Sequence, residues 1–130
     1  MKAFTMIELI FVIVILGILA AVAIPRLAAT RDDAEVAKAV SNIRLGIQDL
    51  GGYYLAKGRF SSNISDMTSV ENPVMVKTER CATFSYQDRN ETILTMNTNG
   101  LCRRVWENST LENLSGMPFT DGIVFVRTTN

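Results

Sequence analysis

The 130-residue sequence contains no histidine, only two cysteines, and basic and acidic side chains in equal number. Without histidine the chain lacks the commonest general base and metal ligand of proteins. Because 13 basic residues balance 13 acidic ones, the chain has no broad electrostatic surface for nucleic acid. The sequence also shows no nucleophile–base pairing, no glycine-rich phosphate loop and no metal-ligand cluster. We therefore expect neither an enzyme nor a tightly bound cofactor.

Charged residues are also missing from residues 4–25, with the exception of Glu8. About twenty helical residues, at ~1.5 Å each, span the ~30 Å hydrocarbon core of a membrane. A charge inside such a span costs ~2.5–3.5 kcal/mol, so Glu8 requires a partner or a function. The simpler alternative is an ordinary membrane anchor that contains one badly placed acid. Pro25 lacks an amide hydrogen and is expected to bend the helix at the end of this stretch.

Residues 4–8 (FTMIE), the apolar run that follows them and Pro25 together resemble the class III signal of type IV pilins and type II secretion pseudopilins. The resemblance implies that residues 1–3 are a prepilin leader, removed by prepilin peptidase between Ala3 and Phe4, and that Phe4 is then N-methylated. The family usually has glycine before the cleavage site and a longer leader, so this chain departs from the pattern at Ala3 and in the length of the leader.

The resemblance implies a structural subunit, a pilin or a major-type pseudopilin, that assembles into a filament through residues 4–25. The new amino group of Phe4 would neutralise Glu8 of a neighbouring subunit, and Pro25 belongs to the same assembly helix. The implied partners are copies of the chain and related pilins, the prepilin peptidase and methyltransferase, an inner-membrane assembly platform and the lipid bilayer.

The implied location is the bacterial inner membrane, crossed once, with the C-terminal domain in the periplasm and the filament periplasmic or at the cell surface. Lys2 on the cytoplasmic side agrees with the positive-inside rule. Two alternatives remain open, a single-pass membrane-anchored binding module and a minor competence pilin for DNA uptake.

Residues 26–57 have the spacing of an amphipathic helix that packs on a globular domain. We expect Gly58 to end this helix and the Ser- and Asn-rich residues 58–73 to form a connecting loop. The apolar positions recur at intervals of three and four, at Val36, Val40, Ile43, Ile47, Leu50 and Tyr54.

The C-terminal region, residues 74–130, is strand-like. Alternation and turn residues predict strands at 81–87, 92–98, 101–106 and 123–127, with a hairpin at Asn99-Gly100. A Ser109-x-x-Glu112 pattern predicts the capping box of a short helical turn. A long helix followed by a strand meander predicts an α+β, pilin-like fold, with the long N-terminal helix packed on a small antiparallel β-sheet.

Cys81 and Cys102 are candidates for a disulfide, because thiols are oxidised outside the cytoplasm. Closing a loop of about twenty residues contributes ~3 kcal/mol to stability. However, the first and third strands of a meander lie ~9.5 Å apart, whereas a disulfide requires Cα atoms within ~7 Å. Either Cys81 precedes its strand, or the strand order differs, or the two thiols are free.

Asp66, Glu71 and Asp121 are weak candidates for a Ca²⁺ site, because the resemblance extends to major pseudopilins that bind calcium in a C-terminal loop. Scattered acids in loops are more often solvated surface residues. From residue 74 onward, the basic residues are matched in number by acidic ones, so a nucleic-acid partner is not expected.

Overall fold

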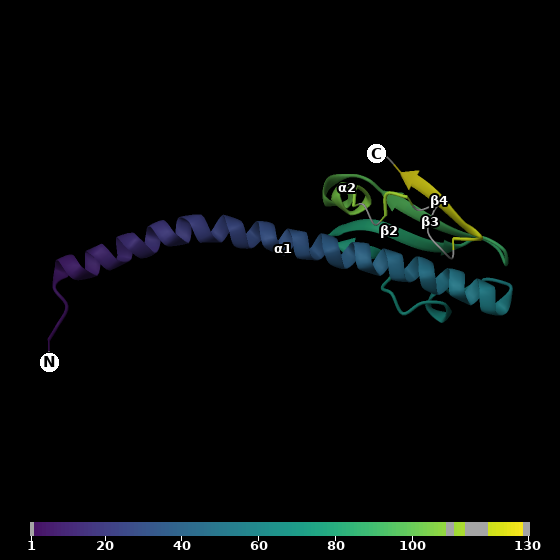
Figure 1. The fold of residues 1–130 in the computed structure, drawn as a ribbon, viewed down its shortest axis with the longest axis horizontal. Helices are drawn as coiled ribbons and strands as arrows, with labels where there is room; N and C mark the ends of the chain where they lie inside the picture. Colours follow the sequence, from purple (N-terminus) through teal and green to yellow (C-terminus); the bar gives the residue numbers. More distant parts are fainter. Residues whose placement is uncertain (1, 109–110, 114–119, 129–130) are drawn as a thin grey trace. The chain divides into compact units, whose positions relative to one another are not determined.

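The structure is a computed structural model that describes residues 2–108, 111–113 and 120–128. The fold is α+β, as the sequence predicts. By contact density the chain divides into two compact units, Met1–Ala34 and Glu35–Asn130, which we call the N-terminal unit and the sheet unit. The elements are α1 (Met6–Lys57), the 3-10 turn η1 (Ile64–Asp66), β1 (Val74–Val76), β2 (Glu79–Tyr86), β3 (Thr92–Asn97), α2 (Gly100–Trp106) and β4 (Ile123–Thr128) (Figure 1).

The four described strands form one mixed sheet in the order β1-β2-β3-β4. β1 pairs with β2 and β2 with β3 in antiparallel fashion, but β4 runs parallel to β3, pairing Thr92 with Ile123 and Asn97 with Thr128. The prediction of a purely antiparallel sheet is therefore wrong. A parallel neighbour requires a crossover connection instead of a hairpin, and the chain between β3 and β4, which contains α2, provides it.

Residues 101–106, predicted as a third meander strand, form α2 instead. Cys102, Val105 and Trp106 are buried, and their spacing of three and four places them on one face of a helix. Short apolar runs are compatible with either a strand or a buried helix turn, and alternation alone does not separate the two. The sequence prediction gave this segment the two-residue period of a strand, whereas its buried residues have the period of a helix.

Asn99-Gly100 begins α2, so the predicted hairpin is wrong. Gly100 has a φ of 55°, a backbone conformation that favours glycine. The Glu79 carboxylate accepts a hydrogen bond from the Leu101 amide at 2.9 Å. A Cβ at position 100 would lie 2.5 Å from Glu79 Oε1. A strand residue therefore supplies the acceptor that the first turn of α2 needs. The capping box predicted at Ser109 lies outside the described residues.

Cys81 and Cys102 form a disulfide, with their Cα atoms 5.0 Å apart. The ~9.5 Å separation between the first and third strands of a meander does not apply to this pair, because Cys102 lies on α2 and not on a third strand. The indole Nε1 of Trp106 also donates a hydrogen bond to the Cys81 carbonyl oxygen at 3.0 Å. Together with the Glu79 contact, these links hold α2 against β2.

β1 is short and is extended by a side chain. The Asn72 amide nitrogen donates to the Phe84 carbonyl oxygen at 2.8 Å, and the Asn72 amide oxygen accepts from the Phe84 amide at 2.9 Å. The side chain of Asn72 thus pairs with β2 as a further strand residue would. The predicted loop 58–73 is otherwise irregular apart from η1, and it is held to α1 where Thr68 Oγ1 donates to Asp49 Oδ2 at 2.6 Å.

The predicted apolar face of α1 forms one wall of the core, and Figure 1 shows the sheet lying along this part of the helix. Full burial of each large aliphatic side chain contributes ~1.5–3 kcal/mol. α1 ends where predicted, since Gly58 has a φ of 69° and its amide donates to the Tyr54 carbonyl oxygen at 2.7 Å. Of the predicted face, Tyr54 is half-buried and five residues are buried: Val36, Val40, Ile43, Ile47 and Leu50.

Phe84 of β2 packs directly on α1 at Gly46. A Cβ added at Gly46 would lie 2.7 Å from Phe84 Cζ and 2.8 Å from Phe84 Cε2. Phe84 is 2% exposed, so its ring has little space into which it can move. The close approach of helix and sheet therefore depends on a residue without a side chain at this position.

Gly46→Ala is expected to destabilise the sheet unit by up to ~2 kcal/mol, because overpacking of the core costs ~1–3 kcal/mol and the gain in helix propensity returns only ~1 kcal/mol. Gly52→Ala is the matched control, since no atom of the described residues lies within 4 Å of a Cβ there, and it is expected to stabilise the protein by up to ~1 kcal/mol. Thermal unfolding of the full chain in detergent micelles measures both. If the midpoint temperature of unfolding shifted in the same direction in both variants, the result would contradict a close Gly46–Phe84 contact.

Candidate functional site

α1 begins immediately after Thr5, and Thr5 and Glu8 each bond to the backbone of the other. The Thr5 amide donates to Glu8 Oε2 at 2.8 Å, and the Glu8 amide donates to Thr5 Oγ1 at 3.3 Å. This reciprocal arrangement is a capping box, which satisfies amide groups that the first turn of a helix leaves without partners. Thr-x-x-Glu before an apolar run is the sequence signature of the motif. The sequence interpretation missed it here.

The capping box leaves part of the Glu8 carboxylate available. Among the described residues, the Glu8 carboxylate bonds only to the Thr5 amide, through Oε2. A carboxylate can accept about four hydrogen bonds on its two oxygens. The negative charge also lies near the positive end of the helix dipole. Glu8 can therefore cap its own helix and still accept a further donor on Oε1.

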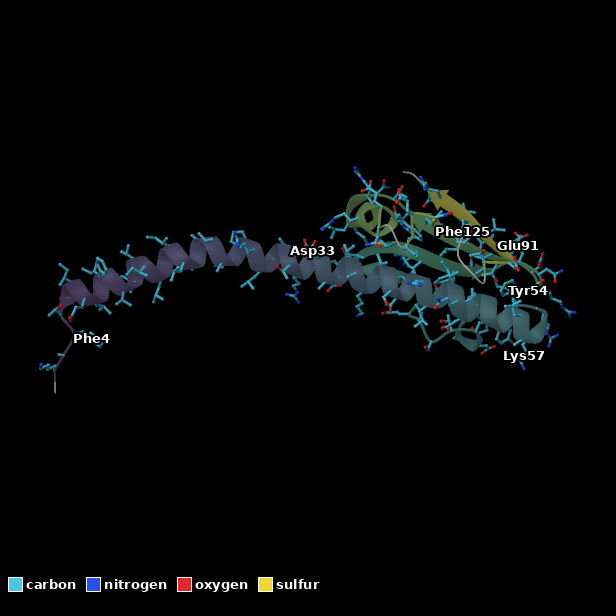
Figure 2. All side chains as sticks on the ribbon, viewed as in Figure 1. Phe4, Asp33, Tyr54, Lys57, Glu91 and Phe125 are labelled. Atoms are coloured by element: carbon cyan, nitrogen blue, oxygen red, sulfur yellow. A yellow bond between two sulfur atoms is a disulfide. The ribbon has the colours of Figure 1, made fainter. Side chains whose placement is uncertain are left out.

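The N-terminal unit has an apolar surface along its helix. Every large apolar side chain from Phe4 to Leu27 is at least 44% exposed, and Figure 2 shows side chains standing out along these turns. In the part of the chain that the structure describes, α1 is the one helix long and apolar enough to cross a membrane, by length and composition. Apolar surface of this extent is typical of membrane or protein contact.

The predicted cleavage site lies outside the helix. Ala3 and Phe4 precede α1 and are exposed, and Figure 2 labels Phe4 before the first turn of the helix. The peptide bond between them is therefore accessible in the single chain. Pro25 lies inside α1, and the helix continues on both sides of it. Because proline has no amide hydrogen, the Ala21 carbonyl loses its helical donor at this point.

The three acids considered for calcium lie in separate places. Asp66 accepts hydrogen bonds from Ser61 Oγ at 3.0 Å and from Asn63 Nδ2 at 3.4 Å within its own loop. Glu71 lies before β1 and Asp121 lies before β4. Within residues 2–108, 111–113 and 120–128, no group of three or more His, Cys, Asp or Glu is placed to hold a metal ion.

Comparison of this chain with models of protein families, with curated proteins and with solved structures finds no match. Its function has to be inferred from its own residues and contacts. The most informative of these are the Thr5–Glu8 capping box and the apolar surface of the N-terminal unit.

Proposed function

We propose that this protein is a structural subunit, a pilin or major-type pseudopilin, of a type IV pilus-like or type II secretion filament. The observation that carries the proposal is Glu8, the one charged residue between Lys2 and Arg26, in a helix long and apolar enough to span a membrane. The chain crosses the bacterial inner membrane once, with Lys2 in the cytoplasm and the sheet unit in the periplasm.

Assembly follows cleavage between Ala3 and Phe4. The new amino group of Phe4 is positively charged and pairs with Glu8 of a neighbouring subunit. Glu8 Oε1 is available for this pairing while Oε2 remains bonded to the Thr5 amide, which cleavage does not remove. Leaving a buried charge without its partner costs ~3–5 kcal/mol. The pair therefore fixes the depth at which each subunit joins the filament.

Two further observations support the proposal. The large apolar side chains from Phe4 to Leu27 are exposed in the single chain, as expected of a surface that lipid covers before assembly and neighbouring helices cover afterwards. The Cys81–Cys102 disulfide suits an oxidising compartment outside the cytoplasm.

A membrane-anchored binding module is the second candidate. The capping box favours it, because capping gives Glu8 a role in any helix of this kind and requires no neighbouring subunit. In that case the chain keeps its leader and does not assemble.

Mass spectrometry of the intact protein from native membranes is expected to show loss of Met1–Ala3 and gain of one methyl group, because prepilin peptidase cleaves and methylates its substrates. Ala3→Leu is expected to remain full-length, since a bulky residue replaces the small one before the cleavage site. A full-length, unmethylated wild-type chain would overturn the filament proposal and favour the anchored module.

A further inference from the structure

A pocket of about 330 Å³ lies at one end of the sheet unit, where the end of α1, the segment after it and the turn between β2 and β3 meet. Its volume is at the lower end of the ~300–1,000 Å³ range of small-molecule sites. Figure 2 labels Tyr54, Lys57 and Glu91 at this end of the unit. The lining includes Tyr53, Arg59, Phe60, Ser62, Tyr86 and Arg89.

The two segments that carry the arginines are joined through the backbone. The Phe60 amide donates to the Arg89 carbonyl oxygen at 2.7 Å. The Phe60 ring is buried and stacks on Tyr54 with a centroid distance of 4.7 Å. A Cβ at Gly122 would lie 2.8 Å from this ring, so a glycine leaves the space that Phe60 occupies. Phe60, which lines the pocket, is therefore held in one position.

The turn that carries Arg89 is also closed by hydrogen bonds. The Asp88 amide donates to the Glu91 carbonyl oxygen at 3.0 Å, and the Asn90 amide donates to Asp88 Oδ1 at 2.7 Å. Arg59 in turn follows directly after Gly58, where α1 ends. The backbone of both arginines is thus held in place without a ligand.

Of the described residues that line the pocket, Arg59 and Arg89 are the only charged ones. Among the described residues, neither guanidinium has a hydrogen-bond or ion-pair partner. Lys57 adds a positive charge nearby in sequence, whereas Asp88 and Glu91 flank Arg89 with negative charge. The C-terminal end of α1 carries a further partial negative charge. The balance favours a ligand with a single anionic group over a polyanion.

The other polar side-chain groups in the described lining of the pocket are the hydroxyls of tyrosine and serine. Tyr53 and Tyr86 offer aromatic faces with phenol groups, and Ser62 offers a hydroxyl. The Ser61 hydroxyl already donates to Asp66. A guanidinium binds carboxylate and phosphate through paired hydrogen bonds, while tyrosine combines an apolar face with a polar group. A bare anion would use only the arginines.

We propose that this pocket binds an acidic sugar, a pyranose ring carrying a carboxylate or a phosphate. The arginines bind the oxyanion, and the tyrosine and serine hydroxyls bond to the ring hydroxyls. Because both arginines are exposed, the affinity is weak, on the order of 1 mM, and falls as the salt concentration rises. The described lining residues all belong to the sheet unit, so the pocket is formed within a single chain and the proposal does not rest on the proposed function.

Saturation-transfer NMR on the full chain in detergent micelles tests the proposal with glucuronate, glucose 6-phosphate and neutral glucose. Saturation transfer is expected to glucuronate, to glucose 6-phosphate or to both, but not to glucose. Comparison of the first two sugars shows whether the pocket prefers a carboxylate or a phosphate. Arg59→Gln with Arg89→Gln is expected to reduce the signal at least about fivefold. Arg103→Gln is the matched control, an exposed arginine on α2, and is expected to leave the signal unchanged.

Four results would overturn the proposal. Equal transfer to glucose would show that the anion is not recognised, and equal loss in Arg103→Gln would show general charge attraction. No transfer to either acidic sugar would show that the pocket does not bind this class. Displacement of the sugar by a short DNA duplex at equal phosphate concentration would show a nucleic-acid site instead.

Discussion

Glu8→Ala is expected to abolish filament assembly and to leave the amount of membrane-inserted chain unchanged. The substitution removes the partner of the Phe4 amino group, and an unpaired buried charge costs ~3–5 kcal/mol, more than ~100-fold in the association constant. Insertion is not impaired, since the substitution removes a charge from the span and adds none. Immunoblots of the sheared filament fraction and of the membrane fraction measure the two quantities separately.

Two matched variants separate the charge of Glu8 from its capping role. Glu8→Gln keeps a side chain that fits a capping box but removes the charge, and it is expected not to assemble. Thr5→Ala removes the hydroxyl that accepts from the Glu8 amide but keeps the charge, and it is expected to assemble. Normal filaments from Glu8→Gln, or loss of filaments only in Thr5→Ala, would show that the carboxylate acts as a helix cap and not as a partner for a neighbour.

Removal of the disulfide by Cys81→Ala with Cys102→Ala is expected to lower the free energy of unfolding of the sheet unit by ~3 kcal/mol. The bond joins positions 21 residues apart, and without it the unfolded chain regains the entropy of a loop of that length. Both cysteines are 0% exposed, so alanine leaves no buried polar group. Urea unfolding of the full chain in detergent micelles, followed by Trp106 fluorescence, measures the change.

Reductant provides the control for this prediction. Reduced wild-type protein is expected to unfold at nearly the same urea concentration as the double variant, and the variant itself is expected not to respond to reductant. A reduced wild type as stable as the oxidised protein would show that the Glu79 and Trp106 contacts hold α2 in place without the bond.

The helix and the strands with clear periodicity could be predicted from the sequence. The face of α1 from Val36 to Leu50 and the end at Gly58 are confirmed, and β3 and β4 lie within one residue of their predicted bounds. α2 could not be predicted, because the acceptor for its first turn comes from Glu79 on a different element. Local propensity at Asn99-Gly100 favours a hairpin, and a tertiary contact overrides it.

The candidate sites differ in how far sequence could reveal them. Glu8 stands out because a charge in an apolar span is costly, although its bond to Thr5 was missed. The pocket has no sequence signature, since Arg59 and Arg89 lie 30 positions apart and are brought together by tertiary contacts such as the hydrogen bond from the Phe60 amide to the Arg89 carbonyl oxygen. The Cys81–Cys102 pairing was left open because it depends on which secondary structure surrounds Cys102.

The parallel pairing of β3 with β4 predicts an order of folding. β1, β2 and β3 pair with neighbours close in sequence, and such contacts form early. β4 joins β3 only after the chain has closed the long loop that contains α2, and closing that loop costs entropy before any pairing is gained. Until then β3 is an exposed edge strand, open to pairing with other chains. At its β3 edge, the sheet unit is therefore expected to be more prone to aggregation before β4 docks than after it.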